Sequence, residues 1–309
     1  MGQTARCSVF GVRSRFVHQV FADLLQKGQL KPSDDVLVVA GGRAERDLLE
    51  KCGFDKVTIT NLDSVEASSH LEPYQWAHED AQNLSYPNKS FQWVIVVDGL
   101  HHCTSPHRAL TEMYRVCLNG VIAIEARDSL LMRVAVRFGF SSKYELEAVV
   151  AQGGRSGGLE NGPIPNYIYR WTEREFKKTI RSCDPTGDHG FSFYYGLNMP
   201  HETADLRGWH FRKILLKPAG LLLRILTSVM PKQRNSIAMI ATRPTAVHPW
   251  IDVAPDLDGV PAVGCKPVCA APPGVSVLED AEAVCGGAAL EEARGSRAPD
   301  AVVEVVAVL

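Results

Sequence analysis

The sequence predicts an α/β protein with a doubly wound, mostly parallel sheet, and two observations support this fold class. The unbroken apolar run at 36–40 and the predominantly apolar stretches at 91–97 and 121–126 have the length and composition of strands that are buried on both faces of a parallel sheet. Helical segments with apolar residues at three- and four-residue spacing lie between them, as in consecutive βαβ units. The sequence therefore predicts one parallel sheet with helices on its faces.

The expected elements follow one another with identifiable boundaries. Pro32 ends the first helix, and the pair Asn119-Gly120 ends the helix before the fifth strand. Thr172 and Glu175 form a capping box at the start of a later helix. In chain order we expect helix 14–27, strand 36–40, helix 44–50, strand 57–60, a short strand before Asp80, strand 91–97, helix 106–117, strand 121–126, helices 128–138 and 172–181, and strands 191–195 and 236–241.

Residues 35–63 form the first βαβ unit of this pattern. Gly41 and Gly42 follow its first strand directly, so the backbone can approach a ligand there, and the next helix presents unpaired N–H groups. Asp63 follows the second strand, about 20 residues after Gly42, which is the spacing at which a carboxylate accepts hydrogen bonds from ribose hydroxyls. We interpret the unit as a nucleoside-binding half-domain; an ordinary tight glycine turn is the alternative.

The chain of 309 residues is long enough for one large α/β domain with appendages. We assign residues 1–250 to this domain and residues 251–309 to a tail, because the sequence beyond residue 251 has no aromatic residue and is rich in Ala, Val, Gly and Pro. From Thr245 onward there are ten acidic and three basic residues, a net charge of −7; the remaining 30 basic and 25 acidic residues give +5. The tail is therefore predicted to be acidic and disordered.

The net charge, the cysteines and the apolar runs of the sequence indicate which partners and which cellular location to expect. The formal net charge of −2 argues against nucleic acid as a partner. The eight cysteines include no CxxC pair and no histidine at metal-binding spacing, so we predict reduced thiols and no metal site. The sequence contains no uninterrupted run of 18 apolar residues, so we expect no membrane-spanning helix. A cytoplasmic location follows by elimination. The oligomeric state is left open.

Three stretches of the chain resemble the class I S-adenosylmethionine-dependent methyltransferases of type 11, over roughly residues 16–245. VLVVAGGRA resembles the first strand and glycine loop of that family, HEDAQNLSYPNKSFQWVIVV the acidic block and fourth strand, and DGLHHCTSPHRALTEMYRV with VIAIEA the following loop, helix and strand. The resemblance implies a Rossmann-like methyltransferase fold in which strands 191–195 and 236–241 form an antiparallel closing pair. It also implies methyl transfer from S-adenosylmethionine to a nucleophile on a small molecule, sugar or lipid.

The resemblance implies cofactor-binding roles for five residues. Gly41 and Gly42 would pass beneath the methionine part of S-adenosylmethionine, and Asp63 would hold the ribose hydroxyls. Asp80 would accept a hydrogen bond from the adenine amino group, and Ala81 would supply a backbone contact beside the ring. A turn or helix-capping role is the alternative for both aspartates.

The resemblance further places Asp98 and His101 after the fourth strand, facing the methyl group and the acceptor, and Asp98 would also contact the cofactor. A histidine can remove a proton from a hydroxyl or amine acceptor, so His101 is the candidate base. Hydrogen bonding to the backbone and shaping of the pocket is the alternative for His101, and His102 is expected to pack or cap.

Three residues depart from the family pattern. Val38 stands where the family usually has an acidic residue, and Ala40 and Ala44 stand where it usually has glycines. These departures motivate a second hypothesis, a methyltransferase-like binding scaffold that is catalytically impaired. A nicotinamide-dependent oxidoreductase is a third hypothesis with less support, because the sequence has no GxGxxG motif and no Tyr-x-x-x-Lys pair on a suitable helix.

Residues 128–187 are expected to form an inserted lid or acceptor region. Its aromatic residues either line a pocket for a small-molecule acceptor or pack inside the lid. The segment 201–234 carries seven basic residues beside Leu-rich sequence. A solvated helix face is the preferred interpretation of this segment, and contact with a membrane surface is the alternative. The aromatic residues are Tyr144, Tyr167, Tyr169 and Trp171.

Overall fold

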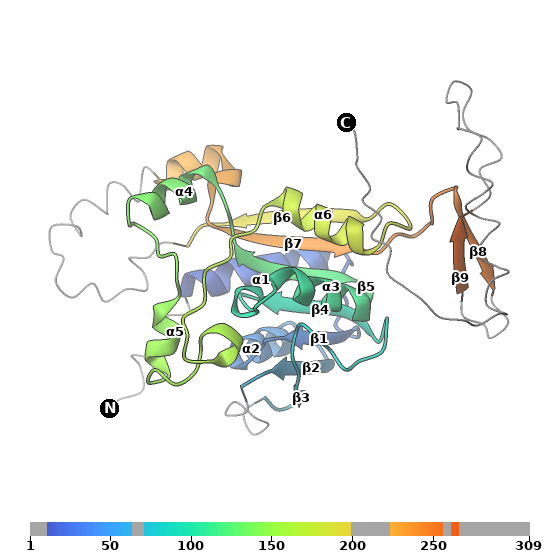
Figure 1. Cartoon of the computed structure of the whole chain (residues 1–309), viewed down its shortest axis with the longest axis horizontal. Helices are drawn as coiled ribbons and strands as arrows, with labels where there is room; N and C mark the ends of the chain where they lie inside the picture. Colours follow the sequence, from blue (N-terminus) through green and yellow to red (C-terminus); the bar gives the residue numbers. More distant parts are fainter. Residues whose placement is uncertain (1–10, 64–70, 199–222, 256–260, 266–309) are drawn as a thin grey trace, which may run out of the picture. The chain divides into compact units, whose positions relative to one another are not determined.

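The computed structural model describes residues 11–63, 71–198, 223–255 and 261–265, with side chains for all but residues 11–14, 252–255 and 261–265. Seven strands form one sheet in the order β3-β2-β1-β4-β5-β7-β6 (Figure 1). The predicted doubly wound α/β class is confirmed. The strands are β1 (Asp35–Val39), β2 (Lys56–Asn61), β3 (Gln75–His78), β4 (Phe91–Val97), β5 (Cys117–Ala126), β6 (Gly190–Gly196) and β7 (Ser236–Thr242).

The pairing of the strands makes the sheet mostly parallel. Neighbouring strands among β1 to β5 pair in parallel, whereas β7 pairs antiparallel with both β5 and β6. The two late strands therefore close the sheet as the resemblance implied. The chain order reverses between β1 and β4, and this switch point is where doubly wound sheets bind their ligands.

Helices cover both faces of the sheet. Side chains of α1 and α2 share one buried cluster with Val36 and Val38 of β1, and side chains of α3 and α6 share the other with Leu37 and Val39. These four β1 side chains are at most 1% exposed, which explains the unbroken apolar run in the sequence. The four helices are α1 (Gly11–Gln26), α2 (Arg43–Lys51), α3 (Pro106–Val116) and α6 (Glu173–Cys183).

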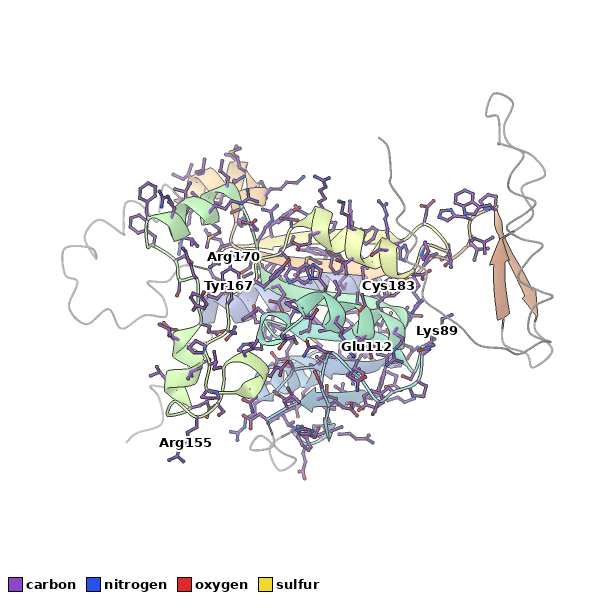
Figure 2. The ribbon with its side chains drawn as sticks, in the orientation of Figure 1. Lys89, Glu112, Arg155, Tyr167, Arg170 and Cys183 are labelled. Atoms are coloured by element: carbon purple, nitrogen blue, oxygen red, sulfur yellow. The ribbon has the colours of Figure 1, made fainter. Side chains whose placement is uncertain are left out.

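The segment between β5 and α6 forms the region predicted as a lid. It contains α4 (Leu130–Arg137), α5 (Leu146–Ala151) and the 3-10 turn η3 (Leu159–Asn161). Figure 2 shows Arg155 at its outer end, pointing away from the sheet. The lid returns to the sheet at Trp171, which is fully buried and whose backbone N–H donates to the carbonyl of Ala126 over 2.9 Å. A further helix at 223–229 and the turn η5 (Pro231–Gln233) precede β7.

The chain divides into two compact units, residues 1–248 and residues 249–309. The second unit contains an antiparallel hairpin of β8 (Ile251–Pro255) and β9 (Pro261–Cys265). This hairpin departs from the expected disordered tail; the rest of that tail, like most of the basic segment 201–234, lies outside the described residues. Within the described ranges, no helix has the length and apolar character needed to cross a membrane.

Candidate functional site

A cavity of about 310 Å³ opens where β1, β2, β3 and β4 end, at the switch point of the sheet. This volume lies at the lower end of the range of roughly 300–1,000 Å³ that small-molecule sites span. The strand ends and the loops beyond them form one wall, and the lid forms another. The strand-end wall is Ala40, Asn61, Leu62, Asp63, Glu79, Asp80, Ala81, Gln82, Asp98, Gly99, His102 and Cys103; the lid contributes Ala148, Ala151, Gln152, Gly157, Gly158, Glu160 and Asn161.

Asp63 lines the cavity just beyond β2. Its backbone N–H donates to Asn61 Oδ1 over 3.1 Å, and the Asn61 side-chain amide donates to the carbonyl of Gly41 over 3.0 Å. Asn61 therefore ties the end of β2 to the turn after β1 and orients the backbone of Asp63. Sequence reasoning missed Asn61, because an asparagine after a strand is also an ordinary turn residue.

The turn after β1 meets the cavity through Ala40, and neither Gly41 nor Gly42 is among the described residues that line it. Ala40 has a φ of 51°, a left-handed conformation that favours glycine. Gly41 is needed for close packing, since a Cβ there would lie 2.5 Å from Val38 Cγ1. The N–H of Gly42 donates to Glu45 Oε2 over 2.8 Å, so a side chain of α2 itself satisfies this helix-terminal donor.

Asp80 and Ala81 line the same cavity as Asp63. Asp80 Oδ1 accepts from the backbone N–H of Gln82 over 2.9 Å and from its side-chain amide over 3.4 Å. Asp80 therefore stabilises a turn, which was the alternative role for this residue, and it also lies in the cavity wall. Gln82 was not singled out from the sequence; its amide also donates to Glu160 Oε1 over 3.2 Å and so joins the strand ends to the lid.

Asp98 lines the cavity at the end of β4 and, like Ala40, has a positive φ, 55°. Its N–H donates to the carbonyl of Ile124 over 2.8 Å, which anchors the turn to β5. The next residue, Gly99, has no space for a side chain, because a Cβ there would lie 2.7 Å from the Cβ of Ala40. The turns after β1 and β4 therefore touch at the floor of the cavity.

His101 lies behind the cavity wall, 5% exposed, between two carboxylates. Its Nδ1 is 2.8 Å from Glu125 Oε2, and its Nε2 is 3.0 Å from Glu145 Oε2. Burial lowers the pKa of His101, but the charges and hydrogen bonds of Glu125 and Glu145 outweigh that effect and raise the pKa to about 9. In this arrangement His101 is an imidazolium without a free lone pair, so the geometry does not favour the predicted role as base.

Glu145 belongs to the lid, so its pairing with His101 holds the lid against the sheet. Glu145 Oε2 also lies 3.3 Å from His102 Nε2, and His102 Nδ1 lies 3.4 Å from the carbonyl of Gly158. Burial raises the pKa of Glu145, but the hydrogen bonds and charges of the two histidines lower it further, well below its usual range. Glu160 adds hydrogen bonds from Thr104 and Gln82.

The aromatic residues proposed for an acceptor pocket are not among the described residues that line the cavity. Trp171 is fully buried and stacks edge-on with Tyr169, with ring centroids 5.3 Å apart. Tyr144 and Tyr167 pair with each other at 5.7 Å and remain 52% and 54% exposed. Trp171 and Tyr169 pack against a buried cluster of the sheet, and Tyr144 and Tyr167 pack against each other within the lid.

The described side chains offer two sets of three possible metal-ligand atoms within 4.8 Å of one another. The first is His101, His102 and Glu145, and the second is Asp98, His101 and Glu125. In both sets the histidines and glutamates lie close together because they form ion pairs: His101 with Glu125 and Glu145, and His102 with Glu145. We therefore assign no metal to either set.

Comparison with known proteins agrees with this architecture. Residues 41–124 match the family model described as a methyltransferase domain. This match agrees with the resemblance to the class I methyltransferases. The match covers the glycine turn, Asp63, Asp80, Asp98 and the strands between them, and S-adenosylmethionine is the cofactor of this class.

Two curated relatives of the methyltransferase domain are the ubiquinone/menaquinone biosynthesis C-methyltransferases UbiE of Xanthomonas oryzae pv. oryzae and Xanthomonas campestris pv. campestris. Each is 29% identical over 104 residues, which are 30% of this chain and 41% of the relative. The chain thus spans about two fifths of the length of these relatives.

Two similar solved structures cover more of the chain at lower identity. One is an S-adenosylmethionine-dependent methyltransferase from Thermotoga maritima, 15% identical, with a TM-score of 0.43 over 74% of this chain and 90% of that one. The other is magnesium protoporphyrin IX methyltransferase from Synechocystis PCC 6803 with bound S-adenosylhomocysteine, 14% identical, with a TM-score of 0.44 over 75% and 83% of the two chains.

Proposed function

We propose that this chain transfers a methyl group from S-adenosylmethionine to a nucleophile on a small molecule, sugar or lipid. The observation that carries the proposal is the charge of the cavity wall. The described lining contains carboxylates but neither lysine nor arginine. The five acidic lining residues are Asp63, Glu79, Asp80, Asp98 and Glu160.

This wall fits the polar groups of S-adenosylmethionine. The cofactor offers a cationic sulfonium, an ammonium group, ribose hydroxyls and an adenine amino group, and a carboxylate can accept from or attract each of them. A dinucleotide would instead bring a pyrophosphate, which an acidic wall repels. The nicotinamide-dependent hypothesis therefore loses further support.

Within the proposal, Asp63 accepts from the ribose hydroxyls and Asp80 from the adenine amino group, with Ala81 beside the ring. Asp98 attracts the positively charged groups at the floor of the cavity, where Ala40 takes the position expected for the glycine pair. Bound S-adenosylmethionine supplies an electrophilic methyl group on a sulfonium that carries its own leaving group. The protein then has to align the acceptor and exclude water, and the lid residues in the cavity wall suit that role.

Binding of S-adenosylhomocysteine, measured by titration calorimetry, tests the cofactor assignment. We expect Asp63→Asn and Asp80→Asn each to weaken binding about tenfold or more, because each removes a charged acceptor of a hydrogen bond. Asp55→Asn is the matched control, since Asp55 is exposed at the start of β2 and is not among the cavity residues. Absence of binding at millimolar ligand would refute the assignment.

A second candidate function is cofactor binding without turnover. The strained Ala40 and the capping of the Gly42 N–H by Glu45 favour it, because both restrict how a ligand can approach the turn. Methyl transfer from labelled S-adenosylmethionine to a panel of hydroxyl, amine and carbon acceptors separates the two functions. One labelled product excludes the impaired scaffold, whereas binding without any product supports it.

A further inference from the structure

Two helices of the first unit leave large apolar side chains in solvent. The helix α4 has no buried residue; Leu130 and Val134, four residues apart on it, and Phe138, which directly follows it, are 68%, 45% and 69% exposed. The helix at 223–229 exposes further apolar residues just before β7. We name the whole set the apolar patch: Leu130, Val134, Phe138, Phe140, Ile225, Leu226, Val229 and Met230.

Hydrogen bonds join the start of α4 to the turn η5, which directly follows the helix at 223–229. The N–H of Leu131 donates to Gln233 Oε1 over 3.1 Å, and the hydroxyl of Ser129 donates to the carbonyl of Gln233 over 3.2 Å. In Figure 1 the helix at 223–229, in orange, overlaps α4 in the view, and α4 contacts the turn η5 that follows this helix. Scattered apolar side chains are normal on a protein surface, whereas large exposed apolar side chains that gather on neighbouring elements mark a surface that another molecule covers.

The charge around the patch indicates what covers it. Residues 128–143 and 223–234 contain six basic residues and one acidic residue, a net charge of +5. The single acid, Asp128, is paired with Arg133 at 2.7 Å. A second copy of the chain would bring the same positive charge to a symmetric interface, where like charges repel. The basic residues are Arg133, Arg137, Lys143, Arg224, Lys232 and Arg234.

We propose that the apolar patch docks on the surface of an anionic lipid membrane. Exposed apolar side chains on helices, flanked by Arg and Lys, are the features by which interfacial helices enter the headgroup region of a bilayer. Arg137 and Lys232 are exposed beside the patch, where anionic headgroups would meet them. Docking through these helices involves none of the residues that line the cofactor cavity, so it is independent of the proposed methyl transfer.

Flotation of the full chain with vesicles tests the apolar contribution. We expect the protein to float with vesicles of phosphatidylcholine and phosphatidylglycerol and not with phosphatidylcholine alone. The double variant Phe138→Ser/Val229→Ser replaces two of the most exposed patch residues and should reduce binding about tenfold or more. Leu118→Ser, 48% exposed at the start of β5, is the matched control and should bind like the wild type.

A second pair of variants tests the charge. Arg137→Gln and Lys232→Gln should each weaken binding to the anionic vesicles about fivefold, and added salt should weaken it further. Lys178→Gln, an exposed cation on α6, is the control and should have no effect.

Three results would overturn the proposal. The first is a wild type that does not bind the anionic vesicles, and the second is a Phe138→Ser/Val229→Ser variant that binds them as well as the wild type does. Sedimentation without lipid could also show a wild-type oligomer that this double variant dissociates, which would make the patch a contact between copies of the chain.

Discussion

Ala40 is a site of backbone strain at the floor of the cavity. A left-handed conformation costs a non-glycine residue about 1–2 kcal/mol, and the nearby Gly99 shows how closely the two turns approach. The family pattern places a glycine at this position. The alanine is therefore tolerated because the strands on both sides hold the turn in place.

Replacing Ala40 by glycine should stabilise the protein. The removed strain exceeds the extra chain entropy of glycine, about 0.5–1 kcal/mol, so we expect Ala40→Gly to raise the free energy of unfolding by about 0.5–1 kcal/mol. Urea denaturation measures this change. Ala44→Gly, inside α2, is the control and should destabilise by a similar amount, because its backbone is helical. A loss of stability in Ala40→Gly would show that the turn is not strained.

His101 makes stability depend on pH. Its pKa of about 9 in the folded protein is higher than the ordinary value of 6.5, so its pairing stabilises the fold fully below pH 6.5, and this stabilisation is lost as the pH rises through 9. We expect the free energy of unfolding to fall by up to roughly 3 kcal/mol between these pH values. Denaturation at several pH values, with an NMR titration of the His101 ring, measures both quantities. A ring that titrates near pH 6.5 would contradict the pairing.

At the scale of elements, the lid is held to the sheet by a small number of polar contacts. Glu145 pairs with His101 and His102, and Glu160 accepts from Gln82 and Thr104. The lid helix α5 buries only Val149. This part of the lid therefore depends on polar contacts as well as on the burial of Val149.

The variant Glu145→Gln should open the lid more often, because it removes the charge that pairs with the two histidines. Arg155 lies exposed at the outer end of the lid and offers a site for trypsin (Figure 2). We expect cleavage at Arg155 to become about tenfold faster, as followed by mass spectrometry. Glu147→Gln, an exposed neighbour on α5, is the matched control. Equal cleavage rates in the two variants would show that Glu145 does not hold the lid.

At the scale of the whole molecule, residues 1–248 contain all seven strands of the main sheet and both buried clusters. Residues 249–309 form a separate compact unit with its own hairpin. The two cores of the sheet therefore do not depend on the second unit.

Removal of residues 249–309 should leave the first unit folded. We expect the melting temperature of fragment 1–248 to stay within about 3 °C of that of the full chain, since a change of roughly 1 kcal/mol corresponds to such a shift in a domain of this size. Circular dichroism measures it. A fragment that ends at residue 235 lacks β7 and should not fold, because β7 joins β5 to β6. A much lower melting temperature for 1–248 would mean that the second unit stabilises the first.

The sequence by itself determined the sheet and the acidic part of the site. Strands buried on both faces need continuous apolar runs, and these are visible in β1, β4 and β5 without any structure. Asp63 and Asp80 could be placed because a parallel sheet brings the carboxyl ends of neighbouring strands to one edge, so position along the chain predicts position in space. The strands β6 and β7 were also visible in the sequence pattern, and the family resemblance supplied their antiparallel pairing at the end of the sheet.

Only the tertiary structure decided the surroundings of His101 and the exposure of α4. Glu125 and Glu145 lie 24 and 44 residues from His101 in sequence, and no local pattern predicts that a lid carboxylate meets a buried imidazole. The apolar spacing of α4 predicts a helix, but the same spacing suits a core helix and a docking helix alike. Whether the apolar side chains of α4 are buried depends on which distant segments of the chain pack against them, and only the tertiary structure gives these contacts.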